Sequence, residues 1–391
     1  MKISIVAETF YPEVNGVAMT MRRTVKRLAE YGHRVQVIRP NPHEDGEERQ
    51  LGIWEEVRLP GYTLPYYKEV VIGLPTFGYL SSLWKKDRPD VVHVVTEGPL
   101  GFEAVITAKF MKIPVISSFH TNFHEYGKHY GVGWLQRFAL SYLKLVHNLT
   151  RLTLTPDQEL IRSLENSGFK NVKYWGRGVD TELFSPRKRS NKLREKFGVK
   201  EEDLLVVQVS RTAVEKNVDL SVRAFRAIKQ AHPTSRFIFV GGGPKKHQME
   251  KMYPEVDFVG WKIDEELATY YASGDLFLFA SETETFGNVV TEALGSGLIV
   301  LTYNYAAGQQ FIRNEENGFV VEKGNEDHFI ESSLSIAERW KELNHLRINA
   351  RETACSIPWS LVFEGYLDQI EGAVKDTAFR PKQEATANTG V

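Results

Sequence analysis

The sequence predicts an α/β protein made of two doubly wound domains, in each of which helices wrap a parallel sheet. Three observations predict this fold class. The 391 residues exceed what one hydrophobic core supports. Short apolar runs alternate with amphipathic stretches, and this alternation occurs once in each half of the chain. A polar, basic and proline-containing segment at 185–192 separates the two halves.

Apolar runs mark the predicted strands of both halves. They lie at 3–7, 35–38, 91–95, 115–119, 152–155 and 172–175, and then at 205–209, 237–240, 256–259, 276–279, 299–302 and 319–321. Helical patterns separate most of them, and the clearest is an i, i+3, i+4 stripe that starts at Ala18 and ends before Gly32. Since parallel strands present ligand sites at their carboxyl ends, we expect a cleft where the two domains face one another.

The chain divides into a first domain, a second domain, a last helix and a tail, predicted at 1–187, 188–357, 358–376 and 377–391. The last helix has Ser360 as its expected N-cap, and Tyr366 and Ile370 on its apolar face. The tail has almost no large apolar residue and is predicted to be disordered.

Composition excludes several classes of protein. A formal charge of −1 and a pI near 6.9 give no reason to expect a nucleic-acid partner. A single cysteine, Cys355, excludes an internal disulfide framework and fits a reducing compartment. The chain begins directly as a strand, and no apolar segment approaches the ~20 residues that span a bilayer. We therefore expect a cytoplasmic protein with at most a peripheral membrane contact.

Two glutamates near the end of the chain are the most informative feature. Glu284 lies in the predicted turn ahead of a short helix, and Glu292 lies more than one turn inside that helix. At ~1.5 Å rise per residue, the helical part of the gap spans only several ångströms. Between the two, the run Phe286-Gly287-Asn288 offers backbone N–H groups at a helix N-terminus, which favours an anion. A sugar–diphosphate–ribose ligand has this layout; solvated surface carboxylates are the alternative.

Two further loops follow strands of the second half. Arg211 and Lys216, in the segment SRTAVEKN at 210–217, could both reach a diphosphate, or could be ordinary charges of a solvated turn. The glycine run at 241–243 is not a dinucleotide fingerprint, because its third glycine position is Lys246. A structural turn and direct ligand contact both remain open for that run.

In the first half, His120 stands at the tip of a strand, which makes it a better candidate for the cleft than an isolated histidine elsewhere; a structural histidine is the alternative. His124 and His129 invite a metal site, but no carboxylate or cysteine pattern completes one. Gly16 precedes the first helix, where it would let the backbone approach a ligand; a plain turn glycine is the alternative.

Basic and apolar surfaces allow a monotopic contact with anionic lipid. Basic residues face away from the apolar stripe of the first helix, and a nearly all-apolar stretch at 134–149 carries two more. These residues are Arg22, Arg23, Lys26 and Arg27, and then Arg137 and Lys144. A solvated charged face and a core helix are the alternative.

Several catalytic patterns are missing from the sequence. It contains no Asp-x-Asp, with which one class of sugar-transfer enzymes holds a metal, and no Gly-x-Ser-x-Gly or His-Glu-x-x-His. A bound diphosphate would therefore be neutralised by Arg211, Lys216 and helix N-termini.

Taken together, these motifs resemble the retaining family-4 glycosyltransferases of GT-B fold. The resemblance rests on Glu284-x7-Glu292, the 210–217 loop, the glycine turn and the two Rossmann-like halves, and it covers all but the tail. Segments at 9–17, 97–101, 118–123 and 175–184 resemble bacterial GDP-mannose-dependent α-mannosyltransferases and sulfoquinovosyl-diacylglycerol synthases. One departure is His124, where related sequences commonly have proline. It puts in doubt the acceptor side of the cleft.

The resemblance implies a role for each candidate residue. Glu284 would contact hydroxyls of the donor sugar and Glu292 the ribose, while Arg211 and Lys216 would stabilise the departing diphosphate. The remaining implied contacts are the backbone of Phe286, Gly287 and Asn288 at the same phosphates, Gly16 near them, His120 beside the reacting sugar, and Val259, Gly260 and Trp261 at the nucleobase. The last helix would cross back to the first domain.

The implied reaction is retaining hexosyl transfer without metal or other cofactor, from a nucleotide-sugar, here GDP-mannose, to a lipid or saccharide acceptor. The favoured acceptor is a diacylglycerol-type glycolipid at the inner face of the cell membrane. A UDP-sugar-dependent member of the family, moving glucosyl or sulfoquinovosyl to diacylglycerol, is the alternative. A sugar-nucleotide epimerase and a non-catalytic sugar-binding protein are more distant ones.

Overall fold

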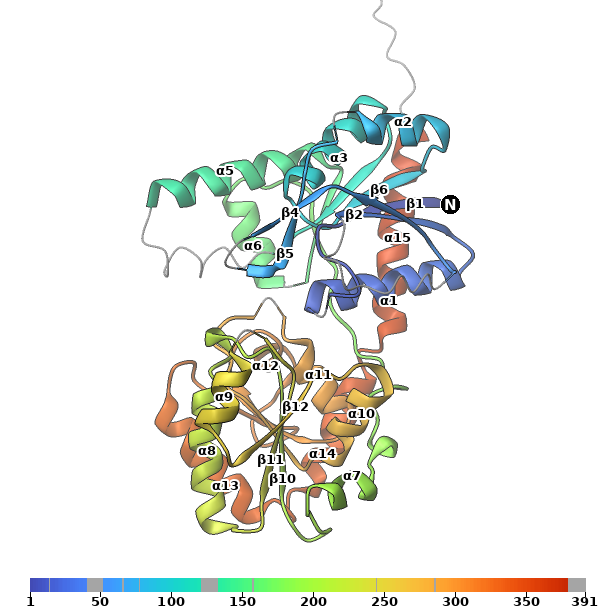
Figure 1. The fold of residues 1–391 in the computed structure, drawn as a ribbon. Coiled ribbons are helices and arrows are strands. Elements are labelled where there is room, and N and C mark those ends of the chain that lie inside the picture. Colours follow the sequence, from blue (N-terminus) through green and yellow to red (C-terminus); the bar gives the residue numbers. More distant parts are fainter. Residues whose placement is uncertain are drawn as a thin grey trace, which may run out of the picture. The chain divides into compact units, whose positions relative to one another are not determined.

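The computed structural model describes residues 1–13, 15–40, 52–64, 67–76, 78–120, 133–156, 158–243, 245–284 and 286–378. The chain forms two compact units, the first made of Met1–Trp175 and Phe363–Val391 and the second of Gly176–Val362 (Figure 1). The chain passes into the second unit earlier than the predicted boundary at 187/188. Val179 and Phe184 account for the difference, because both are fully buried in the core of the second unit.

The first unit is built on a seven-stranded parallel sheet of order β3-β2-β1-β6-β7-β8-β9. Its strands are β1 (Lys2–Val6), β2 (Arg34–Pro40), β3 (Glu55–Leu59), β6 (Val91–Val94), β7 (Val115–Ser118), β8 (Leu152–Thr155) and β9 (Val172–Tyr174). A separate antiparallel hairpin joins β4 (Gly61–Leu64) to β5 (Tyr67–Gly73). The six predicted strands of this half are confirmed. β3 was not predicted because its sequence, EEVRL, mixes charged and apolar residues at the sheet edge.

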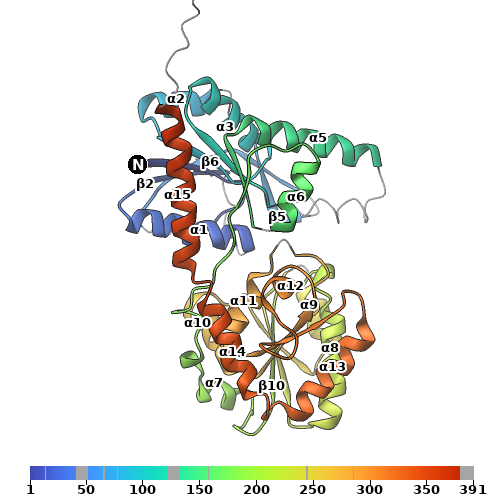
Figure 2. The same cartoon turned by 180° about the vertical axis from the view of Figure 1, so that it is seen from behind.

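Helices pack around this sheet. They are α1 (Gly16–Glu30), α2 (Tyr79–Lys86), α3 (Pro99–Phe110), α5 (Gly133–Leu149), α6 (Gln158–Asn166) and α15 (Trp359–Ala378). The inner sides of α2, α3 and α5 share one hydrophobic cluster with the strands, so these three helices cover the same face of the sheet. Figures 1 and 2 show them side by side.

The last helix, α15, agrees with its prediction except at its start. Tyr366 and Ile370 are fully buried, as expected for its apolar face. Ser360 is not the N-cap, because the helix begins one residue earlier, at Trp359, whose N–H donates to the Val179 carbonyl at 3.0 Å. The Tyr366 hydroxyl lies 2.7 Å from Nδ1 of the buried His93 on β6, and its ring stacks on Trp175. These contacts fix α15 to the first unit.

The second unit is built on a six-stranded parallel sheet of order β12-β11-β10-β13-β14-β15. Its strands are β10 (Leu205–Val209), β11 (Arg236–Val240), β12 (Val256–Gly260), β13 (Leu276–Phe279), β14 (Ile299–Tyr303) and β15 (Phe319–Val321), and they confirm the six predicted ones. Alternate residues of each strand enter two different hydrophobic clusters. The sheet is therefore buried on both faces, which explains why its strands are continuous apolar runs in the sequence.

Helices cover both faces of the second sheet. They are α7 (Asn191–Lys196), α8 (Val218–Ala231), α9 (Lys246–Met252), α10 (Asp264–Ser273), α11 (Asn288–Gly295), α12 (Ala307–Phe311), α13 (Glu326–Arg339) and α14 (Asn344–Cys355), with short 3₁₀ turns at Pro186–Lys188 and Val214–Lys216. From β10 the chain proceeds to β11 and β12 on one side, and then returns to β13 on the other. Ligands of doubly wound sheets bind at such a reversal, beyond the carboxyl ends of the strands.

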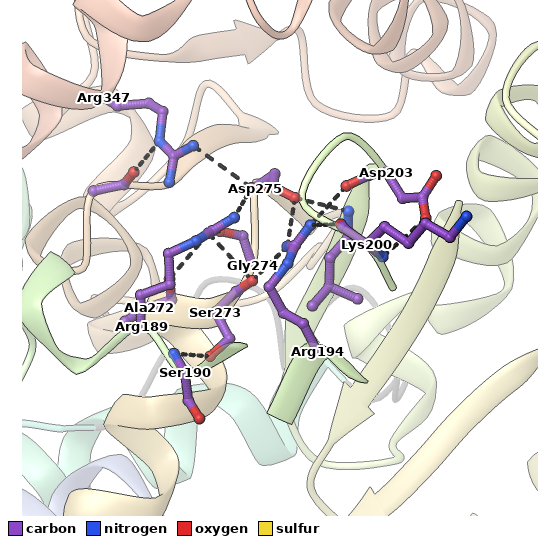
Figure 3. A network of polar contacts seen from close by, with 12 residues as sticks. Arg189, Ser190, Arg194, Lys200, Asp203, Ala272, Ser273, Gly274, Asp275 and Arg347 are labelled. Atoms are coloured by element: carbon purple, nitrogen blue, oxygen red, sulfur yellow. Dashed lines mark hydrogen bonds and ion pairs between the residues drawn. The ribbon is translucent and has the colours of Figure 1, made fainter. Parts of the chain in front are cut away.

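A buried ionic network holds the amino-terminal edge of this sheet (Figure 3). Asp275, which is fully buried, lies 2.9 Å from both Arg189 and Arg194, and its Oδ2 also accepts the Leu205 N–H. Arg347 approaches the same carboxylate at 3.6 Å, and its burial lowers the pKa of that guanidinium. The basic segment at 185–192 is thus tied to the second sheet through Arg189, which places it inside the second unit.

Candidate functional site

Five loops meet at the carboxyl-terminal edge of the second sheet, because all of its strands are parallel. They follow the strands β10, β11, β12, β13 and β14, and they span 210–217, 241–243, 260–263, 280–287 and 304–306. Every site residue predicted in the second half lies in one of these loops, at the end of β12, or at the start of α11. The sheet topology therefore brings together residues that are far apart in the sequence.

The loops after β10 and β13 are joined at the reversal point of the sheet. Lys216 Nζ lies 2.5 Å from Glu284 Oε1, and it also donates to the Thr283 carbonyl at 3.3 Å. The Glu282 N–H donates to the Glu215 carbonyl at 2.9 Å. Two of the predicted ligand residues, one cation and one carboxylate, thus form a direct ion pair whose side chains are only 12% and 17% exposed.

The loop that carries Glu284 is also held from the opposite side, by the loop after β14. The Tyr305 hydroxyl donates to the Glu284 carbonyl at 2.9 Å, and the Ala307 N–H donates to the Phe286 carbonyl at 2.7 Å. The Phe286 ring is buried and packs edge to face on Phe311. Phe286 can therefore offer a ligand only its backbone, as expected.

Gly287 and Asn288 form the start of α11. Gly287 adopts φ +94° and ψ 56°, a left-handed conformation that only glycine takes without strain. The Val290 N–H donates to the Gly287 carbonyl at 3.0 Å, and the N–H groups of Asn288 and Val289 precede it at the end of the helix that favours an anion. This N-terminus stands between Glu284 and Glu292 in the chain, as predicted.

Glu292 lies one turn into α11, and it is 7% exposed. Its Oε2 accepts a hydrogen bond from the Tyr271 hydroxyl at 3.1 Å. Tyr271 is fully buried, so its hydrogen bond fixes the rotamer of the Glu292 side chain from the interior of the unit. The predicted positions of both glutamates relative to the helix are confirmed, and sequence reasoning missed Tyr271 because it lies on α10, with no motif around it.

Arg211 is the most exposed of the predicted charged ligands. Its side chain is 45% exposed, and Nη2 lies 2.9 Å from Glu215 Oε1 in the same loop. The structure therefore pairs each predicted cation with a carboxylate, Arg211 with Glu215 and Lys216 with Glu284. A diphosphate that binds these cations has to compete with both carboxylates.

The glycine run packs three loops against one another. The Gly241 N–H donates to the Gly260 carbonyl, and the Thr212 N–H donates to the Gly242 carbonyl, both at 2.9 Å. A Cβ atom on Gly241 would overlap the Ser210 carbonyl oxygen, and one on Gly242 would lie 2.7 Å from Trp261 Nε1. Close packing of the backbone therefore explains these glycines.

Trp261 stands beside Gly242 at the end of β12, where its side chain remains 43% exposed. It is preceded by Val259 and by Gly260, which has φ +74°. An exposed indole at the outer strand of the sheet offers a flat apolar surface, on the side of β10 away from Glu284 and Glu292. Such a surface suits a nucleobase.

The predicted residues of the first unit lie at the carboxyl-terminal edge of its own sheet. Gly16 is the first residue of α1, and the Asn15 side chain caps that helix through the N–H groups of Val17 and Ala18. His120 follows β7, separated from it by the buried Phe119. His124 and His129 lie outside the described residues. Among the residues that the structure does describe, no group of three potential metal ligands comes together.

Sequence reasoning missed two carboxylates at the reversal point of the first sheet, between β1 and β6. Glu8 accepts the Leu100 N–H at 3.2 Å, and Glu97 lies 3.0 Å from Nε2 of the buried His147. Burial raises the pKa of Glu8 to about 7, and the nearby charge of Glu97 acts in the same direction. Glu8 and Glu97 follow the predicted strands at 3–7 and 91–95, and this position could have identified them as candidate site residues.

Comparison with known proteins agrees with this geometry. Residues 189–353 match the family described as glycosyl transferases group 1, and residues 14–183 match glycosyltransferase family 4. A GDP-mannose-dependent alpha-mannosyltransferase of Mycobacterium tuberculosis is 30% identical over 95% of this chain and 96% of its own. The sulfoquinovosyl transferase SQD2 of Arabidopsis thaliana is 31% identical over 78% of this chain and 60% of its own.

A solved structure shows the same fold over nearly the whole chain. The Anabaena protein HepE, crystallised with UDP and glucose, superposes with a TM-score of 0.73 at 17% identity, and the match covers 95% of this chain and 99% of HepE. The two family matches together cover most of both units, and the mannosyltransferase relative also extends over both. The chain therefore belongs to the family-4 glycosyltransferases of GT-B fold.

Proposed function

We propose that this glycosyltransferase moves a mannosyl group from GDP-mannose to a lipid acceptor, with retention at the anomeric carbon and without a metal. The donor is inferred from the GDP-mannose-dependent relative, and the lipid from the resemblance to sulfoquinovosyl-diacylglycerol synthases. The reaction would take place at the cytoplasmic face of the membrane. Transfer from a UDP-sugar is the competing form of the proposal.

The observation that carries the proposal is the Lys216–Glu284 pair beside the N-terminus of α11. We assign the sugar hydroxyls to Glu284, the ribose hydroxyls to Glu292, and the diphosphate to Arg211, Lys216 and the backbone of Gly287 and Asn288. The guanidinium fork can bind two phosphate oxygens at once, while the ammonium acts as a point charge. In this proposal the cations and N–H groups of this set, and not a metal ion, neutralise the diphosphate.

In the proposed reaction the bond from the anomeric carbon to the diphosphate breaks as the acceptor oxygen bonds to the same face of that carbon. The acceptor proton passes to an oxygen of the departing diphosphate. Negative charge grows on the diphosphate because its bond to the anomeric carbon breaks. Arg211 and Lys216 stabilise this charge more strongly in the transition state than in the ground state. His120 and Gly16 remain predicted donor contacts from the first unit, and Trp261 a predicted contact of the nucleobase.

The test is an incubation with GDP-mannose or UDP-glucose, with and without membrane lipid extract, in the presence and absence of EDTA. We expect GDP release that depends on lipid and is unchanged by EDTA, and a mannolipid whose anomeric configuration by NMR equals that of the donor. Arg211→Ala and Glu284→Ala should each lower turnover, whereas Arg313→Ala, which removes a cation that is 82% exposed on another loop, should not.

Each part of the proposal fails separately. UDP release from UDP-glucose, with no GDP release from GDP-mannose, would show that the donor is a UDP-sugar and not GDP-mannose. Loss of activity in EDTA that Mg²⁺ restores would overturn metal independence, and an inverted product would overturn retention. Wild-type turnover in both Arg211→Ala and Glu284→Ala would contradict the assignment of these two residues to the donor site.

A further inference from the structure

The outer side of α2, α3 and α5 forms one surface layer of the first unit. These helices cover the same face of the sheet through a shared core, with α3 in contact with both α2 and α5 (Figures 1 and 2). Their outward residues therefore belong to a continuous surface, which we call the α2–α3–α5 face. None of the site residues predicted above lies on these helices.

Positive charge dominates this face. The three helices contain five cationic side chains, Lys85, Lys86, Lys109, Arg137 and Lys144. Their sequences include one carboxylate, Glu103, which accepts a hydrogen bond of 2.7 Å from the Thr76 hydroxyl. Asp87, which ends α2, is ion-paired with Lys2 and Arg34. This surplus of positive charge is a local feature of the three helices, since the whole chain has a formal charge of −1.

Large apolar side chains are exposed between these cations. Phe110 on α3 is 85% exposed, and Ile106, one turn earlier, is 43% exposed. On α5, Phe138 is 69% and Leu145 is 53% exposed, two turns apart on one side of the helix. Scattered single apolar residues are ordinary on a protein surface, but four on two adjoining helices make a patch that calls for a partner.

We propose that the α2–α3–α5 face binds the surface of a lipid bilayer that contains anionic headgroups. Cations flanking exposed aromatic and aliphatic side chains are the arrangement of interfacial helices: the cations contact headgroup phosphates while the apolar tips enter the acyl boundary. No helix within the described residues is long and apolar enough to cross a bilayer, so the contact is made from one side. The inference deepens the proposed function, since it brings the enzyme to the layer that holds its lipid acceptor.

The basic face of α1 is the other candidate surface, and the structure favours it less. Arg27 is ion-paired with Glu30 at 3.0 Å, and Arg22 lies over the Tyr11 ring. Tyr31, which is 46% exposed at the end of α1, packs edge to face on Phe363 of α15. The α1 face thus has cations engaged within the protein and no cluster of exposed apolar residues on the helix itself.

The test is co-sedimentation of the full-length protein with vesicles, without any donor. We expect binding to vesicles of phosphatidylcholine with phosphatidylglycerol, little binding to phosphatidylcholine alone, and weaker binding when NaCl rises from about 0.05 to about 0.5 M, because salt screens the cations. The pair Phe110→Ser and Phe138→Ser, and the pair Lys109→Glu and Arg137→Glu, should each lower partitioning at least about tenfold.

Matched control pairs locate the surface. Ile348→Ser with Met252→Ser removes two similarly exposed apolar side chains from the second unit, and Arg23→Glu with Lys26→Glu reverses two charges on α1; both should bind vesicles like the wild type. Equal binding to both vesicle types, or a loss of binding confined to the control pairs, would overturn the inference. This assay contains no donor, so its outcome does not depend on sugar transfer. A protein that binds these vesicles but transfers no sugar in the separate incubation with donors would contradict the proposed function alone.

Discussion

Lys216 and Glu284 bind one another across the reversal point of the second sheet, with Nζ 2.5 Å from Oε1. Lys216 follows β10 and Glu284 follows β13, two neighbouring strands that are separated in the chain by two other strands and three α-helices. The two charges of the pair compensate one another. Binding of a diphosphate sugar would exchange this ion pair for two ligand contacts, one at each end of the pair.

The first prediction concerns this pair. Lys216→Gln removes a cation from the departing diphosphate, and we expect kcat to fall about 10²- to 10³-fold, as for other transition-state donors. Glu284→Gln should lower kcat/KM by roughly one to two orders of magnitude through loss of charge-assisted hydrogen bonds to the sugar. Steady-state kinetics with the preferred donor measures both values. Wild-type kinetics in either variant would show that the pair is only structural.

Glu215 competes with a diphosphate for Arg211, which gives a second prediction of opposite sign. Glu215→Gln keeps the size of the side chain but removes the charge that holds Nη2 at 2.9 Å. We expect nucleoside diphosphate to bind roughly two- to fivefold more tightly, the range set by the energy of an exposed ion pair. Calorimetric titration with GDP and with UDP measures it, and Glu201→Gln, on another loop, is the control. Weaker binding would mean that Glu215 itself contacts the ligand.

The third prediction concerns stability. Asp275→Asn leaves Arg194, a guanidinium that is 2% exposed, without its counter-charge, and breaking a buried pair in this way costs about 3–5 kcal/mol. Asp257→Asn, at the partly exposed pair with Arg236, should cost less than about 1 kcal/mol. Hydrogen exchange of peptides from β10 and β13 reports the second unit separately from the first. Equal protection in the two variants would contradict the assigned role of Asp275.

Glu8 predicts a pH dependence for the first unit. Burial raises its pKa from 4.5 to about 7, so the folded state binds the proton more tightly than the unfolded state does. The stabilisation from this proton is complete below about pH 4.5 and is lost as the pH rises through about 7. Glu8→Gln stays neutral and should therefore gain in melting temperature over the wild type between pH 5 and pH 8, with no gain near pH 4.

A second variant separates charge from hydrogen bonding at this position. Glu8→Ala also removes the acceptor for the Leu100 N–H, so it should be less stable than Glu8→Gln at every pH, and like Glu8→Gln it should lack the pH trend of the wild type. Melting curves of both variants across the pH range make the comparison. A constant offset between Glu8→Gln and the wild type would refute the raised pKa.

Much of this protein is determined by its sequence. The twelve apolar runs became strands because parallel sheets covered by helices on both faces bury most residues of their strands, which leaves a nearly continuous apolar signal. Glu284, Gly287 and Glu292 kept their predicted order around the start of α11, because local chain geometry fixes a turn and the helix that follows it. The edge strand β3 and the β4–β5 hairpin were missed; in β3, charged and apolar residues mix and most side chains are only partly buried.

Tertiary structure alone decided which side chains meet. Strand order brought Lys216 to Glu284, a contact that no spacing in the sequence encodes, whereas Arg211 pairs with Glu215 four residues further along the same loop. Packing of Trp261 and Ser210 on the glycine run makes it a close-packed turn, which no pattern in the sequence specified. Ion pairs of Arg189 and Arg194 with Asp275 place the basic segment after residue 185 in the second unit. A buried carboxylate such as Asp275 requires positively charged partners, and this segment and α7 supply them.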